Sequence, residues 1–256
     1  MADARLEILY ADNHLLAVNK PAGVPCQADA SGDATLVDAV QAYLKEKYRK
    51  PGNVFVGLVH RLDRPVAGVV VLARTSKAAA RLSAAFREGR IRKTYRAVVS
   101  GRFDTDAGRL EHWLRKVSRR RRSEVTGPND PGARQALLDY RVLATEGGAS
   151  LLEVALHTGR SHQIRVQMAA VGHPILGDLK YGAGAPLPGG AIALYARCLR
   201  FDHPTRDQAV EIVAPDPPGW SWPPGEPAWE RNGFSSALPF ATREDGVLKP
   251  NRRSGG

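Results

Sequence analysis

Short apolar runs separated by turn residues recur from the N-terminus to Pro215, and they predict a sheet-rich fold. Residues 6–10 and 15–19 have the length of strands and are joined by a polar turn. The β-branched runs at residues 54–60 and 68–74 are typical of buried strands. Further strands are predicted over residues 93–101, 133–159, 194–202 and 208–215. The second of these is a hairpin that turns at Gly147 and Gly148.

Three segments show helical spacing of their apolar residues, over residues 35–48, 77–89 and 161–172. Thr35 is expected to cap the first helix, and Thr75 or Ser76 the second. In the third, Ser161 and Arg165 are expected one turn apart on the same face. The fold class that fits is mixed α/β (α+β), with a long, mostly antiparallel sheet and helices packed against it.

The composition changes at Pro215, and 8 of the 18 prolines and 3 of the 4 tryptophans lie from this residue to the C-terminus. We therefore expect one domain over residues 1–220 and a C-terminal extension over residues 221–256, disordered beyond about residue 231. Trp220, Trp222 and Trp229 are expected to pin the start of this extension onto the domain. The alternative is that they stack on nucleic-acid bases.

The net charge of +11 is concentrated in one stretch. Residues 81–122 contain 14 basic and 4 acidic side chains, and the part from 102 to 133 is expected to be an exposed basic excursion between strands. Such a field favours a polyanion as partner, either nucleic acid or an anionic membrane surface. A membrane protein is disfavoured, because no apolar run approaches the roughly 18 residues of a span and no basic amphipathic helix is present. The two cysteines form no metal or disulfide pattern, which fits a cytoplasmic protein.

A first candidate for chemistry is Asp63, which lies between Arg61 and Arg64 where an apolar strand gives way to a loop. Nearby cations lower the pKa of a carboxyl group and keep it ionised, as a carboxylate nucleophile requires. The alternative is a loop aspartate in an ordinary surface ion pair.

Two further candidates lie on a strand and a helix. Lys93 and Tyr95 share one face of an alternating strand, so Tyr95 could offer a flat ring and a phenol to a substrate base, or be an ordinary half-buried strand residue. Arg165 stands among apolar helix residues, and if it points inward it must pair with an anion, for which Asp63 is the natural candidate. A solvated, unpaired Arg165 is the alternative.

Three ordered motifs together resemble those of the RluA-type RNA pseudouridine synthases. They are HRLD from His60, KTYRAVVSG from Lys93 and HTGRSHQIRVQMAAVGHPILGDLKYG from His157. The opening YADNHLLAVNKPAGVP is similar to the first hairpin of that family, and the resemblance covers about residues 7–220. It implies an α/β catalytic domain around a long antiparallel sheet, an isomerase activity on RNA, and no cofactor or metal.

The resemblance also implies roles for individual residues. Asp63 matches the catalytic aspartate, Tyr95 the active-site tyrosine, and Arg165 the arginine that forms a salt bridge with the aspartate. Arg61 matches a residue that can fill the gap left by an extruded base. The RNA-contacting set is expected to comprise Arg61, Arg64, Lys93, Arg119, Arg120, Arg121, Arg122, Arg160 and His162.

The expected activity is the isomerisation of specific uridines in ribosomal or transfer RNA, by base flipping and an aspartate nucleophile, in a monomer with no obligatory protein partner. The alternative is a non-catalytic RNA-binding or ribosome-assembly protein on the same scaffold. One departure from the family pattern follows the aspartate, where Pro65, Val66 and Ala67 replace the acid, Thr and Ser that are common there. Pro65 removes one N–H, so the hydrogen bonds of this loop must differ from those of relatives.

Overall fold

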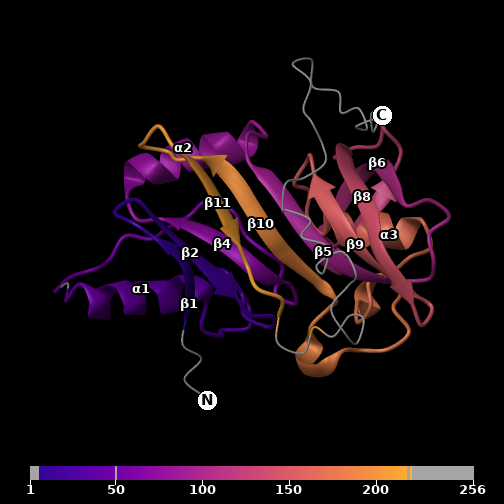
Figure 1. Ribbon diagram of the computed structural model, residues 1–256, viewed down its shortest axis with the longest axis horizontal. Coiled ribbons are helices and arrows are strands. Elements are labelled where there is room, and N and C mark those ends of the chain that lie inside the picture. Colours follow the sequence, from indigo (N-terminus) through magenta and orange to yellow (C-terminus); the bar gives the residue numbers. More distant parts are fainter. Residues whose placement is uncertain (1–5, 50, 218–219, 221–256) are drawn as a thin grey trace, which may run out of the picture. The chain divides into compact units, whose positions relative to one another are not determined.

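The computed structural model describes residues 6–49, 51–217 and 220, and their strands form one mixed but mostly antiparallel sheet (Figure 1). Its main path runs β1-β2-β4-β10-β5-β9-β8-β6-β7, with β11 beside β10 and β3 beside β4. Only the pairing of β4 with β10 is parallel among these described strands. The predicted fold class is confirmed.

The strands are β1 (Glu7–Ala11), β2 (Leu15–Lys20), β3 (Gly57–Leu58), β4 (Ala67–Ala73), β5 (Arg92–Ser100), β6 (Ala107–Val117), β7 (Arg122–Thr126), β8 (Arg134–Glu146), β9 (Ala149–Leu156), β10 (Leu194–Asp202) and β11 (Ala209–Val213). The helices are α1 (Leu36–Lys47), α2 (Ser76–Arg87) and α3 (Gln163–Ala170), with short 3-10 turns η1 (Ser118–Arg120), η2 (Leu179–Tyr181) and η3 (Pro188–Gly190).

The first two helices begin where the sequence predicts. Thr35 and Asp38 form a reciprocal capping box at the start of α1, and the Thr75 hydroxyl accepts the N–H of Ala78 at the start of α2. Helix α2 packs on β4, and its buried face joins a core with β2, β10 and β11. Helix α3 contacts β6 and β7, at the other end of the sheet in Figure 1.

The predicted strand over residues 54–60 is wrong except at Gly57 and Leu58. Strand β3 pairs with β4 at Leu72 and Ala73, where β4 ends, and β10 takes the same edge of β4 further back, at Ala67 and Gly68. Between these two pairings the Val71 N–H donates to Nε2 of His60, 2.9 Å away. A side chain therefore replaces the backbone of β3 in the ladder.

The basic excursion predicted over residues 102–133 is also wrong as a loop, because β6 and β7 make it a hairpin of the sheet. Strand β6 pairs with β8 along eight residues, from Ala107 to Leu114. Its alternation is hard to read because only Leu114 is buried, while charged or polar residues occupy five of the other ten positions.

At the end of the described chain, the Trp220 ring meets Tyr195 of β10 edge to face, with ring centroids 4.8 Å apart. This contact agrees with the predicted pinning role of Trp220. Residues Met1–Trp220 form one compact unit. The predicted extension from residue 221, including Trp222 and Trp229, lies outside the described residues.

Candidate active site

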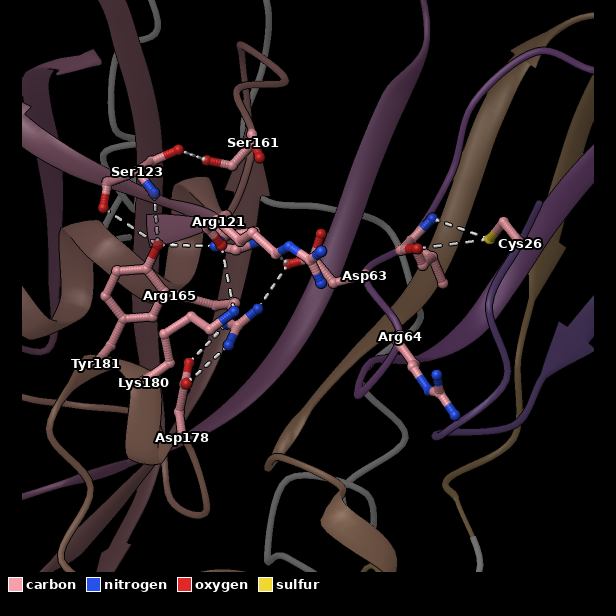
Figure 2. Close-up of polar contacts among 12 residues, drawn as sticks. Cys26, Asp63, Arg64, Arg121, Ser123, Ser161, Arg165, Asp178, Lys180 and Tyr181 are labelled. Carbon is pink, nitrogen blue, oxygen red and sulfur yellow. Dashed lines mark hydrogen bonds and ion pairs between the residues drawn. The ribbon is translucent and has the colours of Figure 1, made fainter. Parts of the chain in front are cut away.

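Asp63 lies in the loop between β3 and β4, and several contacts fix this loop. The Asp63 carbonyl accepts the Val66 N–H at 3.0 Å. The N–H of Leu62 donates to the Cys26 sulfur at 3.4 Å, a contact drawn at Cys26 in Figure 2. Gly68 follows with φ of 113°, and a Cβ there would lie 2.3 Å from the Ala196 carbonyl oxygen. Only glycine allows β4 and β10 to approach so closely beside the loop.

Lys20 supports the same loop from strand β2, which the sequence did not predict. Its buried ammonium donates to the carbonyl oxygens of Pro21, Val24 and Arg64 at 2.8 to 3.2 Å. Burial lowers the pKa of Lys20 to about 8, against the opposing effect of the Asp63 charge. The bond to Arg64 joins the end of β2 to the Asp63 loop, and the other two fix the segment that follows β2.

Arg165 points inward from α3 and joins two carboxylates (Figure 2). Its Nη1 lies 3.0 Å from Oδ2 of Asp63, while Nε and Nη2 reach the two oxygens of Asp178 at 2.6 and 2.8 Å. The side chain of Arg165 is only 5% exposed, whereas that of Asp63 is 30% exposed. Burial opposes the charge of Arg165, but its bonds to Asp178 and the charge of Asp63 outweigh burial and raise its pKa.

The inward orientation of Arg165 and its pairing with Asp63 are as predicted from sequence. The two arginines beside Asp63 in the sequence do not form its ion pair. Arg64 turns away to the Gly23 carbonyl and to Asp33, and the side chain of Arg61 is exposed. Figure 2 shows Arg64 directed away from Asp63. The cation that holds the candidate nucleophile therefore comes from a helix 102 residues further along the chain.

Tyr95 lies on β5 with Lys93 two positions before it on the same face. Burial, and then the charge of Asp63, raise the pKa of the Tyr95 phenol well above its usual value. The phenol is therefore neutral near pH 7. It can stack or donate a hydrogen bond, but it is not a resting base.

His162 differs from its predicted place on a helix. It has a left-handed backbone, with φ of 56°, and α3 starts one residue later. The predicted helical face shared by Ser161 and Arg165 is therefore wrong. The His162 ring instead lies in the site, with Nε2 3.6 Å from Oδ2 of Asp63 and Nδ1 2.7 Å from the Tyr181 hydroxyl. Its side chain is mostly buried, at 14% exposure.

The remaining cations of the predicted RNA-contacting set fall into two groups. Lys93 donates weakly to the Thr158 carbonyl at 3.4 Å, and Arg160 donates to the Gln135 carbonyl at 2.8 Å. Burial, with the charge of Arg160, lowers the pKa of Lys93. Arg119 and Arg121 are exposed at the turn between β6 and β7, where Arg120 also lies, and Arg122 is half-buried at the start of β7.

Asp178 and Tyr181 were missed as site residues, although both stand in the GDLKYG motif. Asp178 is buried to 1% exposure and Tyr181 lies with its ring 5.1 Å from the Arg165 guanidinium carbon. The available signal was an aspartate among apolar residues close after the helix that carries the inward arginine. No group of three metal-ligating side chains occurs among the described residues, and none of their helices is long and apolar enough to cross a membrane.

Comparison with known proteins decides the family. Residues 14–170 match the family described as RNA pseudouridylate synthase. The chain belongs to this family. The "Ribosomal large subunit pseudouridine synthase D" of Zymomonas mobilis is 36% identical over 225 residues, covering 84% of this chain and 70% of the relative. The protein of the same name from Xylella fastidiosa is 37% identical over 233 residues, covering 84% and 67%.

The synthase also shares its fold with solved structures. The "Human RNA Pseudouridylate Synthase Domain Containing 4" superposes with a TM-score of 0.70 at 24% identity, over 82% of this chain and 88% of that one. This likeness confirms the mixed fold. The family membership confirms an isomerase that acts on RNA and forms pseudouridine.

Proposed function

We propose that the synthase isomerises uridine in structured RNA, foremost ribosomal RNA, with Asp63 as the nucleophile. The observation that carries this proposal is the pairing of a partly exposed Asp63 with the buried Arg165 at 3.0 Å. Among the carboxylates on Arg165, Asp178 is inaccessible and Asp63 alone can reach a substrate. The names of the relatives in Zymomonas mobilis and Xylella fastidiosa favour large-subunit ribosomal RNA over transfer RNA.

The reaction breaks the N1–C1′ bond of uridine and forms a C5–C1′ bond in its place. In the simplest route an Asp63 oxygen attacks C1′ and uracil leaves with the N1 electron pair. The uracil then turns, C5 attacks C1′, and the Asp63 carboxylate is released before C5 loses its proton. Attack of Asp63 at C6 is the alternative route. Both routes need the nucleotide to be flipped out of its helix, at a cost of a few kcal/mol that is least in loops.

Each neighbour of Asp63 has a physical task in this scheme. Arg165 orients the carboxylate and neutralises its charge beside RNA phosphates. Tyr95, a neutral phenol on β5, offers a flat face and a hydrogen-bond donor to the flipped uracil. Arg61, exposed beside Asp63, is available to fill the space that the base vacates.

The RNA backbone is gripped by cations around this site. Lys93, Arg160, Arg119, Arg121 and Arg122 supply positive charge to this grip, whereas Arg64 joins its loop to the segment between β2 and α1 through Asp33. Hydrogen bonds to phosphates position the RNA without reading its sequence. We place the synthase in the cytoplasm as a monomer that needs no protein partner.

The substitution Asp63→Asn tests the assignment of the nucleophile. The amide is nearly isosteric but cannot attack carbon, so we expect no pseudouridine in an otherwise reactive RNA transcript and an unchanged Kd for that RNA. Asp207→Asn, which changes an exposed aspartate in the turn between β10 and β11, serves as the matched control and should retain full activity. Pseudouridine formed by purified Asp63→Asn would overturn the assignment.

The substrate is identified by mapping pseudouridines across total RNA with and without the gene, followed by reaction of the purified synthase with the transcript. Loss of a site in large-subunit ribosomal RNA is the expected result, and loss of transfer-RNA sites only would refute the ribosomal assignment. A wild-type protein that binds RNA but modifies none would favour the non-catalytic RNA-binding alternative.

A further inference from the structure

The turn that carries the basic residues is fastened directly to the catalytic segment. We call residues 118–126 the basic hairpin. Its Ser123 is buried and donates its hydroxyl proton to the Ser161 carbonyl at 2.7 Å, and its Arg121 carbonyl accepts from Lys180 at 3.2 Å (Figure 2). Ser161 and Lys180 flank the residues that hold Asp63. The basic hairpin and the nucleophile therefore belong to one network.

Tyr181 stands at the centre of this network. Its hydroxyl oxygen accepts the Ser123 N–H at 2.9 Å and lies 2.7 Å from Nδ1 of His162, while its ring faces the Arg165 guanidinium. The hydroxyl proton has two acceptors, the Ser123 carbonyl at 3.2 Å and the much nearer His162 nitrogen. The shorter contact favours donation to His162.

This hydrogen bond fixes which nitrogen of His162 carries the proton. A neutral imidazole that accepts at Nδ1 holds its proton on Nε2, the atom 3.6 Å from Oδ2 of Asp63. Burial lowers the pKa of His162, and Arg165 lowers it further, against the opposing effect of Asp63, so the neutral ring is favoured. The distance of 3.6 Å between Nε2 and Oδ2 is too long for a hydrogen bond, and a small shift of the ring would close it.

Backbone strain occurs at both ends of the network. Among the described residues other than glycine, positive φ is found at Arg49, Arg121 and His162, and the last two belong to this network. Such conformations cost free energy and persist where the surrounding contacts hold them, which is common at functional sites. Arg121 in the basic hairpin and His162 beside Asp63 are thus held by the same set of bonds.

We propose that Tyr181 is a positioning residue that couples the seating of RNA phosphates on the basic hairpin to the placement of His162 against Asp63. A phosphate bound by Arg119 and Arg121 steadies the turn and, with it, the Ser123 N–H. The Tyr181 hydroxyl then holds His162 with its Nε2 proton toward Asp63. This inference rests on the proposed function and adds a link between RNA binding and the chemical step.

The substitution Tyr181→Phe removes the hydroxyl and keeps the ring beside Arg165. At saturating RNA we expect the single-turnover rate to fall about 10- to 100-fold, as for a misplaced catalytic group, while the Kd for RNA stays unchanged. Tyr140→Phe is the matched control, because its hydroxyl contacts only Thr105 among the described residues, and it should keep the wild-type rate.

A double-mutant cycle separates coupling from a merely structural role. The pair Arg119→Gln and Arg121→Gln should slow the step at saturating RNA in the wild-type background, and should slow it no further when Tyr181→Phe is present. Additive effects would overturn the proposal, as would an unchanged rate in Tyr181→Phe. If Tyr181→Phe proves unstable, His162→Asn takes its place, since Asn tolerates the left-handed backbone of residue 162, and the same non-additivity is expected.

These outcomes are distinct from a failure of the proposed function. A wild-type protein that is inactive on every RNA contradicts the enzyme assignment itself. An active wild-type protein with an additive cycle refutes only the coupling through Tyr181.

Discussion

Arg165 is shared by two carboxylates, Asp63 and Asp178, and substitution of one should affect catalysis while substitution of the other affects stability. Asp178 is buried at 1% exposure and makes two hydrogen bonds to the guanidinium, whereas Asp63 is 30% exposed and makes one. Asp178→Ala should therefore chiefly lower stability. Asp63→Ala should chiefly abolish catalysis.

The size of the expected stability loss in Asp178→Ala follows from the Arg165 charge that stays buried. Removing one partner of a buried ion pair costs about 3–5 kcal/mol, because the remaining charge stays buried without compensation. Arg165 keeps its hydrogen bond to Asp63 in Asp178→Ala, so we expect the lower end of that range, about 3 kcal/mol. In a domain of this size each kcal/mol shifts the Tm by about 2–4 °C, which gives a decrease of roughly 6–12 °C.

Asp63→Ala leaves Arg165 bound by both oxygens of Asp178. The ion pair that this substitution removes is partly exposed, and such pairs contribute about 0–1 kcal/mol. We expect a Tm close to that of the wild type, together with complete loss of pseudouridine formation.

Thermal unfolding and urea unfolding of the three proteins at pH 7 measure the difference. The urea m-value should stay constant, which shows that the change lies in stability rather than in the extent of unfolding. Equal loss of stability in Asp178→Ala and Asp63→Ala would refute the division of labour on Arg165. A loss below about 1 kcal/mol in Asp178→Ala would show that the buried pair contributes no more than a surface pair.

Two further predictions concern protons and salt. Burial lowers the pKa of His60 to about 3, so below the unfolded value of about 6.5 the unfolded chain binds a proton that the folded chain does not. Urea unfolding measures the difference in unfolding free energy between the wild type and His60→Gln. This difference should be full above pH 6.5 and shrink as the pH falls toward 3. A difference that stays constant with pH would contradict a pKa of His60 lowered by burial. For the pair Arg119→Gln and Arg121→Gln, the slope of log Kd against log salt should decrease by about 0.7–0.9 for each RNA phosphate that is no longer neutralised. Arg87→Gln, an exposed arginine of α2 in the same basic stretch, is the control, and equal slopes for both variants would count against the hairpin as the grip.

The sequence by itself determined the features that depend on neighbours along the chain. Alternation and apolar runs located β5, β8, β9 and β10, and Thr35 and Thr75 marked the starts of α1 and α2. An arginine among apolar helix residues required a buried anion, so the pairing of Arg165 with Asp63 could be inferred before any coordinates.

Only the tertiary structure decided which groups complete the site. Asp178 accepts two hydrogen bonds from Arg165, and His162 lies outside the helix with its ring toward Asp63. The Tyr181 hydroxyl links His162 to Ser123 of the basic hairpin. Strand β3 is limited to two residues and shares one edge of β4 with β10. The physical reason is that hydrophobic periodicity and capping act within a few residues of the chain. Ion pairs and strand partners join segments that only the fold brings together: Asp63 and Arg165 are 102 residues apart, and Ala67 of β4 and Tyr195 of β10 are 128 residues apart.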